Sequence, residues 1–188
     1  MHRIATALAA LLISLPAQAA DLAQMNEESR AAVQEFFAAL KGELVAAIEQ
    51  GGPPNAIGAC NEKAPALAAA ISARKGWRVA RTSLKPRNPG NAPDAWESAV
   101  LRNFEARKAA GEDPAGIEFS ALVDQAGGQA YRYMKAIPTA EKPCLACHGK
   151  QLSPEVSARL DALYPADQAR GYRAGDLRGA FTITRTLR

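Results

Sequence analysis

The amino-acid sequence predicts an α+β fold, with an antiparallel sheet, helices gathered to one side of it and a long helix near the N-terminus. Two observations lead to this prediction. Apolar residues recur at helical spacing over residues 21–50, and two β-type runs, 117–123 and 129–137, flank a Gly-Gly turn. Helices and strands do not alternate regularly along the chain, which excludes a doubly wound parallel sheet.

The expected elements follow one another in order. The helix over 21–50 ends at Gly51-Gly52-Pro53-Pro54, and Asn55 is the expected N-cap of a second helix that runs to Lys75 and ends at Gly76. The remaining expected elements are a strand over 77–84, a loop over 85–94, a helix from Asp94 to Ala110, the hairpin, a helix capped by Ser153 and a strand over 180–187.

The N-terminus predicts a signal peptide over residues 1–19. A short basic start, Met1-His2-Arg3, precedes an apolar run from Ile4 to Leu15 and an A-x-A cleavage site at Ala17-Gln18-Ala19. The apolar run is too short to cross a bilayer as a helix, and no later stretch is apolar enough to do so. We therefore expect residues 20–188 to form a single domain that is exported as a soluble protein to the periplasm.

The charge of the chain is mildly basic and evenly spread. Its formal net charge is +4, and removal of Arg3 with the signal peptide leaves 22 basic and 19 acidic residues. Basic and acidic side chains are interspersed, and no basic cluster has interleaved aromatic residues. The pattern excludes a nucleic-acid-binding surface and is typical of solvated charge.

The most informative motif is Cys144-Leu145-Ala146-Cys147-His148, a C-x-x-C-H pattern typical of c-type haem attachment. Two thiols at this spacing can form thioether bonds to the two vinyl groups along one edge of a porphyrin. His148 then lies under the iron and can donate an imidazole nitrogen as the proximal ligand. Gly149 follows where the backbone needs room beside the macrocycle. We expect one covalently attached haem c.

Three other interpretations of the cysteines are weaker. A redox C-x-x-C motif usually begins a helix after a strand, whereas prolines flank this motif and predict a loop. A Cys₃His zinc site that includes Cys60 is disfavoured because Cys147 and His148 are adjacent in sequence, which is not the usual zinc-ligand spacing. The third interpretation is a haem-free binding domain cross-linked by a Cys144–Cys147 disulfide. It holds only if no haem is attached.

The choice of a second axial ligand is narrow, because His148 is the only histidine left after removal of the signal peptide. A bis-histidine haem within one chain is therefore excluded. Cys60, Met25 and Met134 remain, together with a weaker donor or an open site. Cys60 lies on the apolar face of its expected helix. Cys60 is either a small buried hydrophobic residue or a ligand. Because it would otherwise be a free thiol in an oxidising compartment, the second interpretation is favoured.

Three cations are candidates for pairing with haem propionates. Arg81 belongs to the expected strand over 77–84, and Lys85 and Arg87 belong to the long loop that follows it. An ordinary solvated connection explains each of these three residues equally well.

The chain also resembles the PAS-like c-type haem domain family, found as small exported bacterial proteins and as the extracytoplasmic part of some sensor kinases. The blocks that carry the resemblance are, in order, Ala56 to Asn61 with Ala64-Pro65, Gly76 to Val79 with Arg81-Thr82-Ser83, Arg87-Asn88-Pro89 with Asn91, Pro93 and Trp96, Cys144 to Gly149, Tyr164-Pro165, Asp167, Ala169, Gly171-Tyr172, Gly175-Asp176 and Gly179-Ala180. The resemblance implies a PAS-like antiparallel sheet with flanking helices. It also implies axial ligation of the haem iron by the motif histidine, His148, and by a cysteine that corresponds to Cys60.

These inferences predict a periplasmic c-type cytochrome that senses redox state or a diatomic gas, or that transfers electrons at low potential, because a thiolate ligand stabilises ferric iron. If both axial positions are filled, a substrate has no open coordination site, which disfavours an enzyme. The alternative is a haem peroxidase or small-molecule reductase with an open iron and Arg81, Arg132 or Glu62 as distal acid–base group. We expect no transmembrane segment after signal removal, so the partner is a separate redox or signalling protein, which the sequence does not identify.

Overall fold

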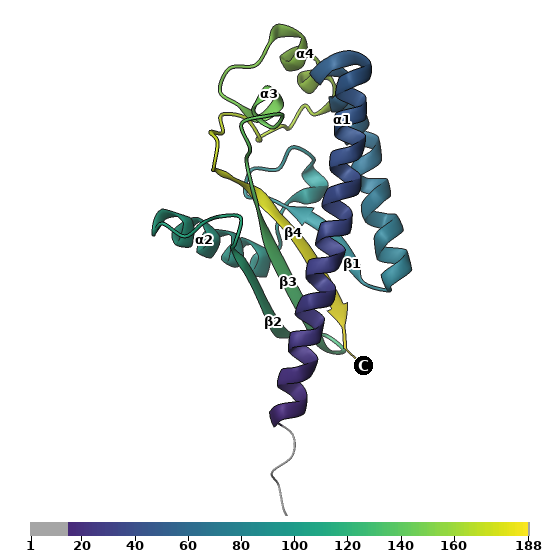
Figure 1. The fold of residues 1–188 in the computed structure, drawn as a ribbon, viewed down its shortest axis with the longest axis vertical. Helices are drawn as coiled ribbons and strands as arrows, with labels where there is room; N and C mark the ends of the chain where they lie inside the picture. The colour runs from purple at the N-terminus through teal and green to yellow at the C-terminus, as the bar shows by residue number, and fades with distance from the viewer. Residues whose placement is uncertain (1–14, 188) are drawn as a thin grey trace, which may run out of the picture.

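The computed structural model describes the backbone of residues 15–187 and the side chains of residues 21–187. The predicted signal peptide therefore lies largely outside the described residues. The strands β1 (Arg78–Thr82), β2 (Glu118–Gln125), β3 (Gly128–Pro138) and β4 (Leu177–Thr186) form one antiparallel sheet in the order β1-β4-β3-β2 (Figure 1). Helices flank this sheet, which confirms the predicted α+β fold. Within the described part of the chain, no helix is long and apolar enough to cross a membrane.

Helix α1 (Leu15–Lys75) is a hairpin of two antiparallel helices, visible in Figure 1 as a long rod that turns back at the end of the molecule. The turn lies at Gly51 and Gly52, whose backbones are not helical; Gly52 has a φ of 71° and a ψ of −175°. An ion pair between Glu35 on the first helix and Lys75 at the end of the second, 3.8 Å long, joins the two antiparallel arms. The predicted break between the two helices is therefore confirmed.

The details of that turn differ from the prediction. Asn55 does not cap the second helix, because its amide Nδ2 donates a hydrogen bond to the carbonyl oxygen of Ala47 at 2.9 Å and so bridges the two arms. The helical backbone already resumes at Pro53, where a missing backbone N–H costs nothing in a first turn. Gly76 has a φ of 68° and its N–H reaches the carbonyl of Ser72 at 2.9 Å, which confirms it as the residue that ends α1.

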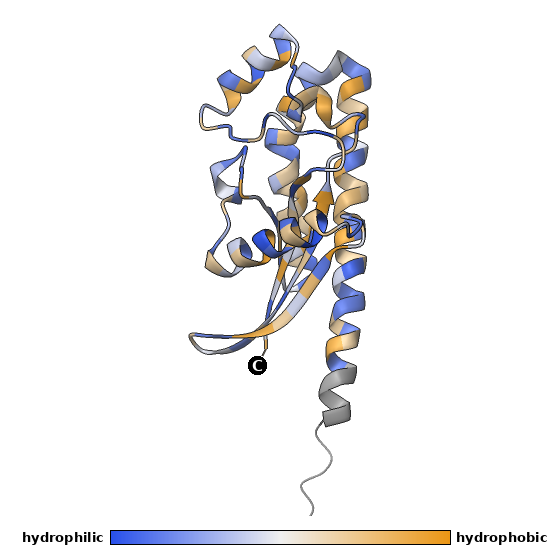
Figure 2. Ribbon diagram, turned by 90° about the vertical axis from the view of Figure 1, so that its left-hand side faces the viewer, coloured by the Kyte–Doolittle hydropathy of each residue, from blue (hydrophilic) through white to orange (hydrophobic). Residues whose placement is uncertain are grey.

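Helices cover both faces of the sheet, which corrects the expectation that they gather on one side. The hairpin α1 packs on the face that carries Tyr131 and Tyr133 of β3. Helix α2 (Ala95–Ala109) packs on the opposite face, over Met134 and Ala136. Because successive strand residues point to opposite faces and β3 carries buried apolar residues on both of them, each face needs a cover. Figure 2 shows hydrophobic and hydrophilic residues interspersed along the ribbon of the N-terminal helix beside the sheet.

Local signals in the sequence place the other elements close to their predicted positions. Asp94 and Glu97 form a capping box at the start of α2, and the Oγ of Ser153 accepts a hydrogen bond from the N–H of Val156 at the start of α4 (Pro154–Leu163). The hairpin of β2 and β3 turns through Gly127, which has a φ of 91°. The last strand begins at residue 177, three residues earlier than predicted.

The tip of the α1 hairpin, the short helix α3 (Leu145–His148) and α4 meet at one end of the molecule (Figure 1). A small apolar cluster joins them, formed by Ile57 of α1 with Val156, Leu160 and Tyr164 from α4 and its end. Cys147 packs against this cluster. The C-x-x-C-H motif is therefore held at a junction of three elements that are distant in sequence.

Candidate functional site

The C-x-x-C-H motif forms a single helical turn, α3, rather than the plain loop that the sequence predicts. The N–H of His148 donates to the carbonyl oxygen of Cys144 at 2.9 Å, and the N–H of Gly149 donates to that of Leu145 at 3.0 Å. A Cβ added at Gly149 would lie only 2.5 Å from the Leu145 carbonyl oxygen. Glycine is therefore required at this position by the backbone of α3 itself. The turn presents two half-buried thiols, Cys144 and Cys147, beside the imidazole of His148.

The imidazole of His148 is oriented by the loop that follows α4. Its Nδ1 lies 2.8 Å from the carbonyl oxygen of Ala169. A carbonyl oxygen can only accept, so Nδ1 carries the proton and Nε2 keeps a free lone pair. Burial lowers the pKa of His148 well below its usual value, and the cations Arg178 and Arg87 act in the same direction. The ring is thus a neutral imidazole with one nitrogen available as a metal ligand.

Arg87 ties the motif to the same loop. Its Nη2 donates to the carbonyl oxygens of Cys147 at 2.6 Å and Ala169 at 3.1 Å, and its Nε donates to the carboxylate of Asp167 at 3.2 Å. The side chain of Asp167 is 1% exposed. Two of the three guanidinium nitrogens of Arg87, a predicted propionate partner, therefore already donate hydrogen bonds to the protein. These bonds connect α3 to residues 167–169.

Cys60 lies on the second arm of α1, one helical turn after Ile57, and is half-buried. Burial raises the pKa of its thiol, and the nearby guanidinium groups of Arg81 and Arg87 act in the opposite direction. Burial likewise raises the pKa of the Cys147 thiol, and a negative charge on Cys60 would raise it further. The fold thus brings Cys60 close to Cys147, although 86 residues separate them in the chain.

Two largely buried guanidinium groups lie near the motif, Arg81 beside Cys60 and Arg178 beside His148, and neither forms an ion pair with a carboxylate of residues 21–187. Burial lowers the pKa of Arg81, and the Cys60 thiol and Tyr164 hydroxyl partly offset this effect. Burial also lowers the pKa of Arg178, to about 10. Arg178 donates from Nη1 to Ser83 Oγ at 3.0 Å, but its buried Nε has no hydrogen-bond partner in the described part of the chain. Buried cations without counter-ions are costly, so this part of the site is suited to an anionic group.

Arg178 is the residue that the sequence analysis missed. It stands at the start of β4, just before the strand that the sequence predicts over 180–187. Its only signal in the sequence was its position between the blocks Gly175-Asp176 and Gly179-Ala180, which the resemblance had already singled out. Arg178 lies close to the loop after β1 because β1 pairs with β4, and the sequence does not reveal this pairing.

The other candidates differ in how near they lie to the motif. Lys85 is exposed and lines a cleft beside Tyr172, whose ring packs edge to face on that of His148, so its predicted role as a propionate partner stays a prediction. Met134 is fully buried under α2, on the sheet face opposite the α1 hairpin, and Met25 packs against the core between that hairpin and the sheet. In the stretch from 21 to 187, no group of three or more His, Cys, Asp or Glu side chains is placed to hold a metal ion.

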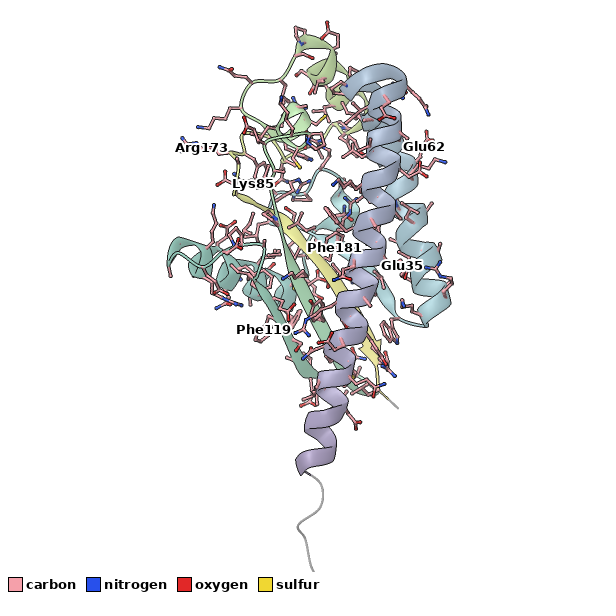
Figure 3. The ribbon with its side chains drawn as sticks, in the orientation of Figure 1. Glu35, Glu62, Lys85, Phe119, Arg173 and Phe181 are labelled. Atoms are coloured by element: carbon pink, nitrogen blue, oxygen red, sulfur yellow. The ribbon has the colours of Figure 1, made fainter. Side chains whose placement is uncertain are left out.

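Of the three side chains considered as a distal acid–base group, only Arg81 lies near the thiols. Arg132 is engaged under α2, where its Nη2 lies 2.7 Å from Asp94 and 3.3 Å from Glu97. Glu62 is exposed on the outer side of α1 (Figure 3).

Comparisons with known proteins agree with this architecture. The profile of the Tll0287-like family matches residues 11–185. The crystal structure of the cyanobacterial haem protein Tll0287 is similar to this chain at 27% sequence identity and a TM-score of 0.62, over 84% of this chain and 94% of that one. No match was found among curated proteins. The family profile covers nearly the whole sequence, and the chain therefore belongs to the Tll0287-like family.

Proposed function

We propose that this protein binds one haem, attached covalently as haem c at the junction of α3 and the tip of α1. The similarity to a cyanobacterial haem protein supports haem binding. The observation that carries the proposal is the state of His148, whose Nδ1 is engaged by Ala169 while Nε2 is free, directly after two thiols at C-x-x-C spacing. This arrangement matches what a proximal haem ligand requires.

Each residue of the site has a role in this proposal. Cys144 and Cys147 would form the thioether bonds, and His148 and Cys60 would be the two ligands of the iron. The guanidinium groups of Arg81 and Arg178 fit the haem propionates, since neither forms an ion pair with a carboxylate of the described residues and a propionate would supply one. When bound, the haem supplies an Fe(III)/Fe(II) couple, which a thiolate ligand shifts to low potential.

A site with two filled axial positions suits electron transfer, or sensing of redox state or of a diatomic gas, better than catalysis. We place the mature protein in the periplasm, where c-type haem is attached, and we propose a separate redox or signalling protein as its partner. The enzymatic alternative keeps only Arg81 as a distal acid–base candidate near the thiols, since Arg132 is bound to carboxylates and Glu62 is exposed.

The test is production of the full chain in a periplasm competent for c-type haem attachment. Haem staining after denaturing electrophoresis, with the intact mass, should show one haem per chain. The Cys144→Ser/Cys147→Ser double variant should lose the covalent haem, whereas Cys60→Ser, which leaves both attachment thiols in place, should keep it. An intact mass without haem in the unmodified protein would refute the proposal.

A further inference from the structure

A cleft of about 190 Å³ lies beside the haem site, between β1, α2 and the start of β4. One wall is the segment Ser83 to Lys85, which follows β1. The opposite wall is one face of α2, where Leu101, Glu105 and Lys108 follow one another at helical spacing. Figure 3 labels Lys85 near the start of β4. We call this space the Lys85 cleft. This volume suits a small ligand.

Tyr172 forms the side of the Lys85 cleft nearest the haem motif. Its ring centroid lies 6.2 Å from that of His148, edge to face, and the Nζ of Lys85 lies 5.8 Å from the centroid of the same Tyr172 ring. The Cζ of Arg178 lies 5.7 Å from that centroid. An occupant of the cleft would therefore be one aromatic ring away from the proximal histidine.

The charges in the Lys85 cleft are of both signs. Lys108 and Asp176 satisfy each other, with Nζ and Oδ1 2.8 Å apart. Lys85 and Glu105 are left, one cation and one anion, and within the described residues neither forms an ion pair or a side-chain hydrogen bond with its charged group. Both line the same space from opposite walls. The cleft thus offers one unpaired positive and one unpaired negative charge.

Apolar side chains complete the lining. Leu84 is 39% exposed, and Leu101 and Leu177 line the same space. We propose that the Lys85 cleft binds a small zwitterion, an α-amino acid with a short apolar side chain. Lys85 would pair with its carboxylate, Glu105 with its ammonium, and the leucines would cover its side chain.

The inference concerns binding alone, so it does not depend on covalent attachment of haem. The experiment is isothermal titration of the full-length protein as isolated, with L-valine as the probe. Two compounds test the need for both charges: 3-methylbutanoate keeps the carboxylate and lacks the ammonium, and 2-methylpropylamine keeps the ammonium and lacks the carboxylate. Two variants test the location, Lys85→Met and Glu105→Gln. Their matched controls are Lys41→Met and Glu43→Gln, at exposed positions on the first arm of α1.

We expect valine to bind with one site per chain, and each cleft variant to weaken the Kd at least about tenfold, while the two control variants keep it unchanged. The two singly charged compounds should bind at least about tenfold more weakly than valine. Three results would overturn the inference. They are no heat of binding up to about 10 mM valine, binding that survives both cleft substitutions, and equal affinity for 3-methylbutanoate, which would mark a simple anion site.

Discussion

The Nδ1 of His148 and the carbonyl oxygen of Ala169 lie 2.8 Å apart, and this hydrogen bond joins α3 to a loop 21 residues further along the chain. It fixes both the tautomer and the orientation of the ring through the protein's own main chain. The N–H of Tyr172 donates to the His148 carbonyl oxygen at 2.9 Å, so the same loop also holds the backbone of the histidine. A proximal ligand that is oriented in this way loses little freedom when it binds iron.

The carboxylate of Asp167 anchors this loop, and we predict that its replacement reduces stability in a pH-dependent way. Burial alone would raise the pKa of Asp167, but the N–H of Ala169 and the cations Arg170 and Arg87 together hold it below its usual value. A carboxylate with a lowered pKa stabilises the fold fully above its unfolded-state pKa of about 4. This contribution is lost as the pH falls through the folded-state pKa.

Asp167→Asn should therefore lower the free energy of unfolding by about 2 kcal/mol at pH 7. The difference from the unmodified protein should shrink as the pH falls below about 4. Urea unfolding followed by circular dichroism over this pH range measures both effects, with Asp124→Asn at an exposed position of β2 as control. A difference that stays constant from pH 7 to pH 3 would show that the Asp167 charge does not stabilise the loop.

Arg178 should influence the iron through its charge. Removal of a buried positive charge near the haem favours the ferric state, so Arg178→Met should lower the reduction potential. We expect a shift of about 60 mV, a tenfold change in the one-electron equilibrium. Spectroelectrochemical titration measures it, and Arg173→Met, at an exposed position five residues earlier, is the matched control. Equal potentials in the two variants would place Arg178 outside the electrostatic reach of the haem.

Gly149 should be intolerant of any side chain, because a Cβ would clash with the carbonyl oxygen of Leu145 at 2.5 Å. Gly149→Ala should cost about 2 kcal/mol of stability and reduce the yield of haem-bearing protein. Gly42→Ala is the control, since a Cβ there meets nothing within 4 Å and alanine is the better helix former. Thermal unfolding of both variants separates the two cases. A Gly149→Ala protein as stable as the parent would mean that α3 can shift without cost.

Much of the fold could be predicted from the sequence because its signals are local. The Gly51-Gly52 break, the capping box of Asp94 and the cap at Ser153 each act over one helical turn. The cover of the second sheet face by α2 was not predicted, because the apolar stripe of a helix does not say which sheet face it will meet. The role of Asn55 was wrong for the same kind of reason, since its partner Ala47 lies on the other arm of the hairpin.

The candidate site could be predicted only in part. The motif residues Cys144, Cys147 and His148 are contiguous and carry their chemistry in their spacing. The position of Cys60 beside Cys147 depends on the hairpin of α1 and the packing of α4, and the sequence alone left Met134 as an alternative. The position of Arg178 near the motif depends on strand pairing. The hydrogen bonds of Arg87 depend on a loop 80 residues away.

Ligation of one covalent haem by His148 and Cys60 can be read from the low-temperature electron paramagnetic resonance spectrum of the ferric protein. We predict a low-spin signal typical of thiolate ligation that disappears in Cys60→Ala and persists in Met134→Leu, with covalent haem retained in both. A low-spin signal unchanged in Cys60→Ala would contradict this ligation and leave Cys60 with a packing role alone. Loss of the signal in Met134→Leu alone would assign the ligand to methionine.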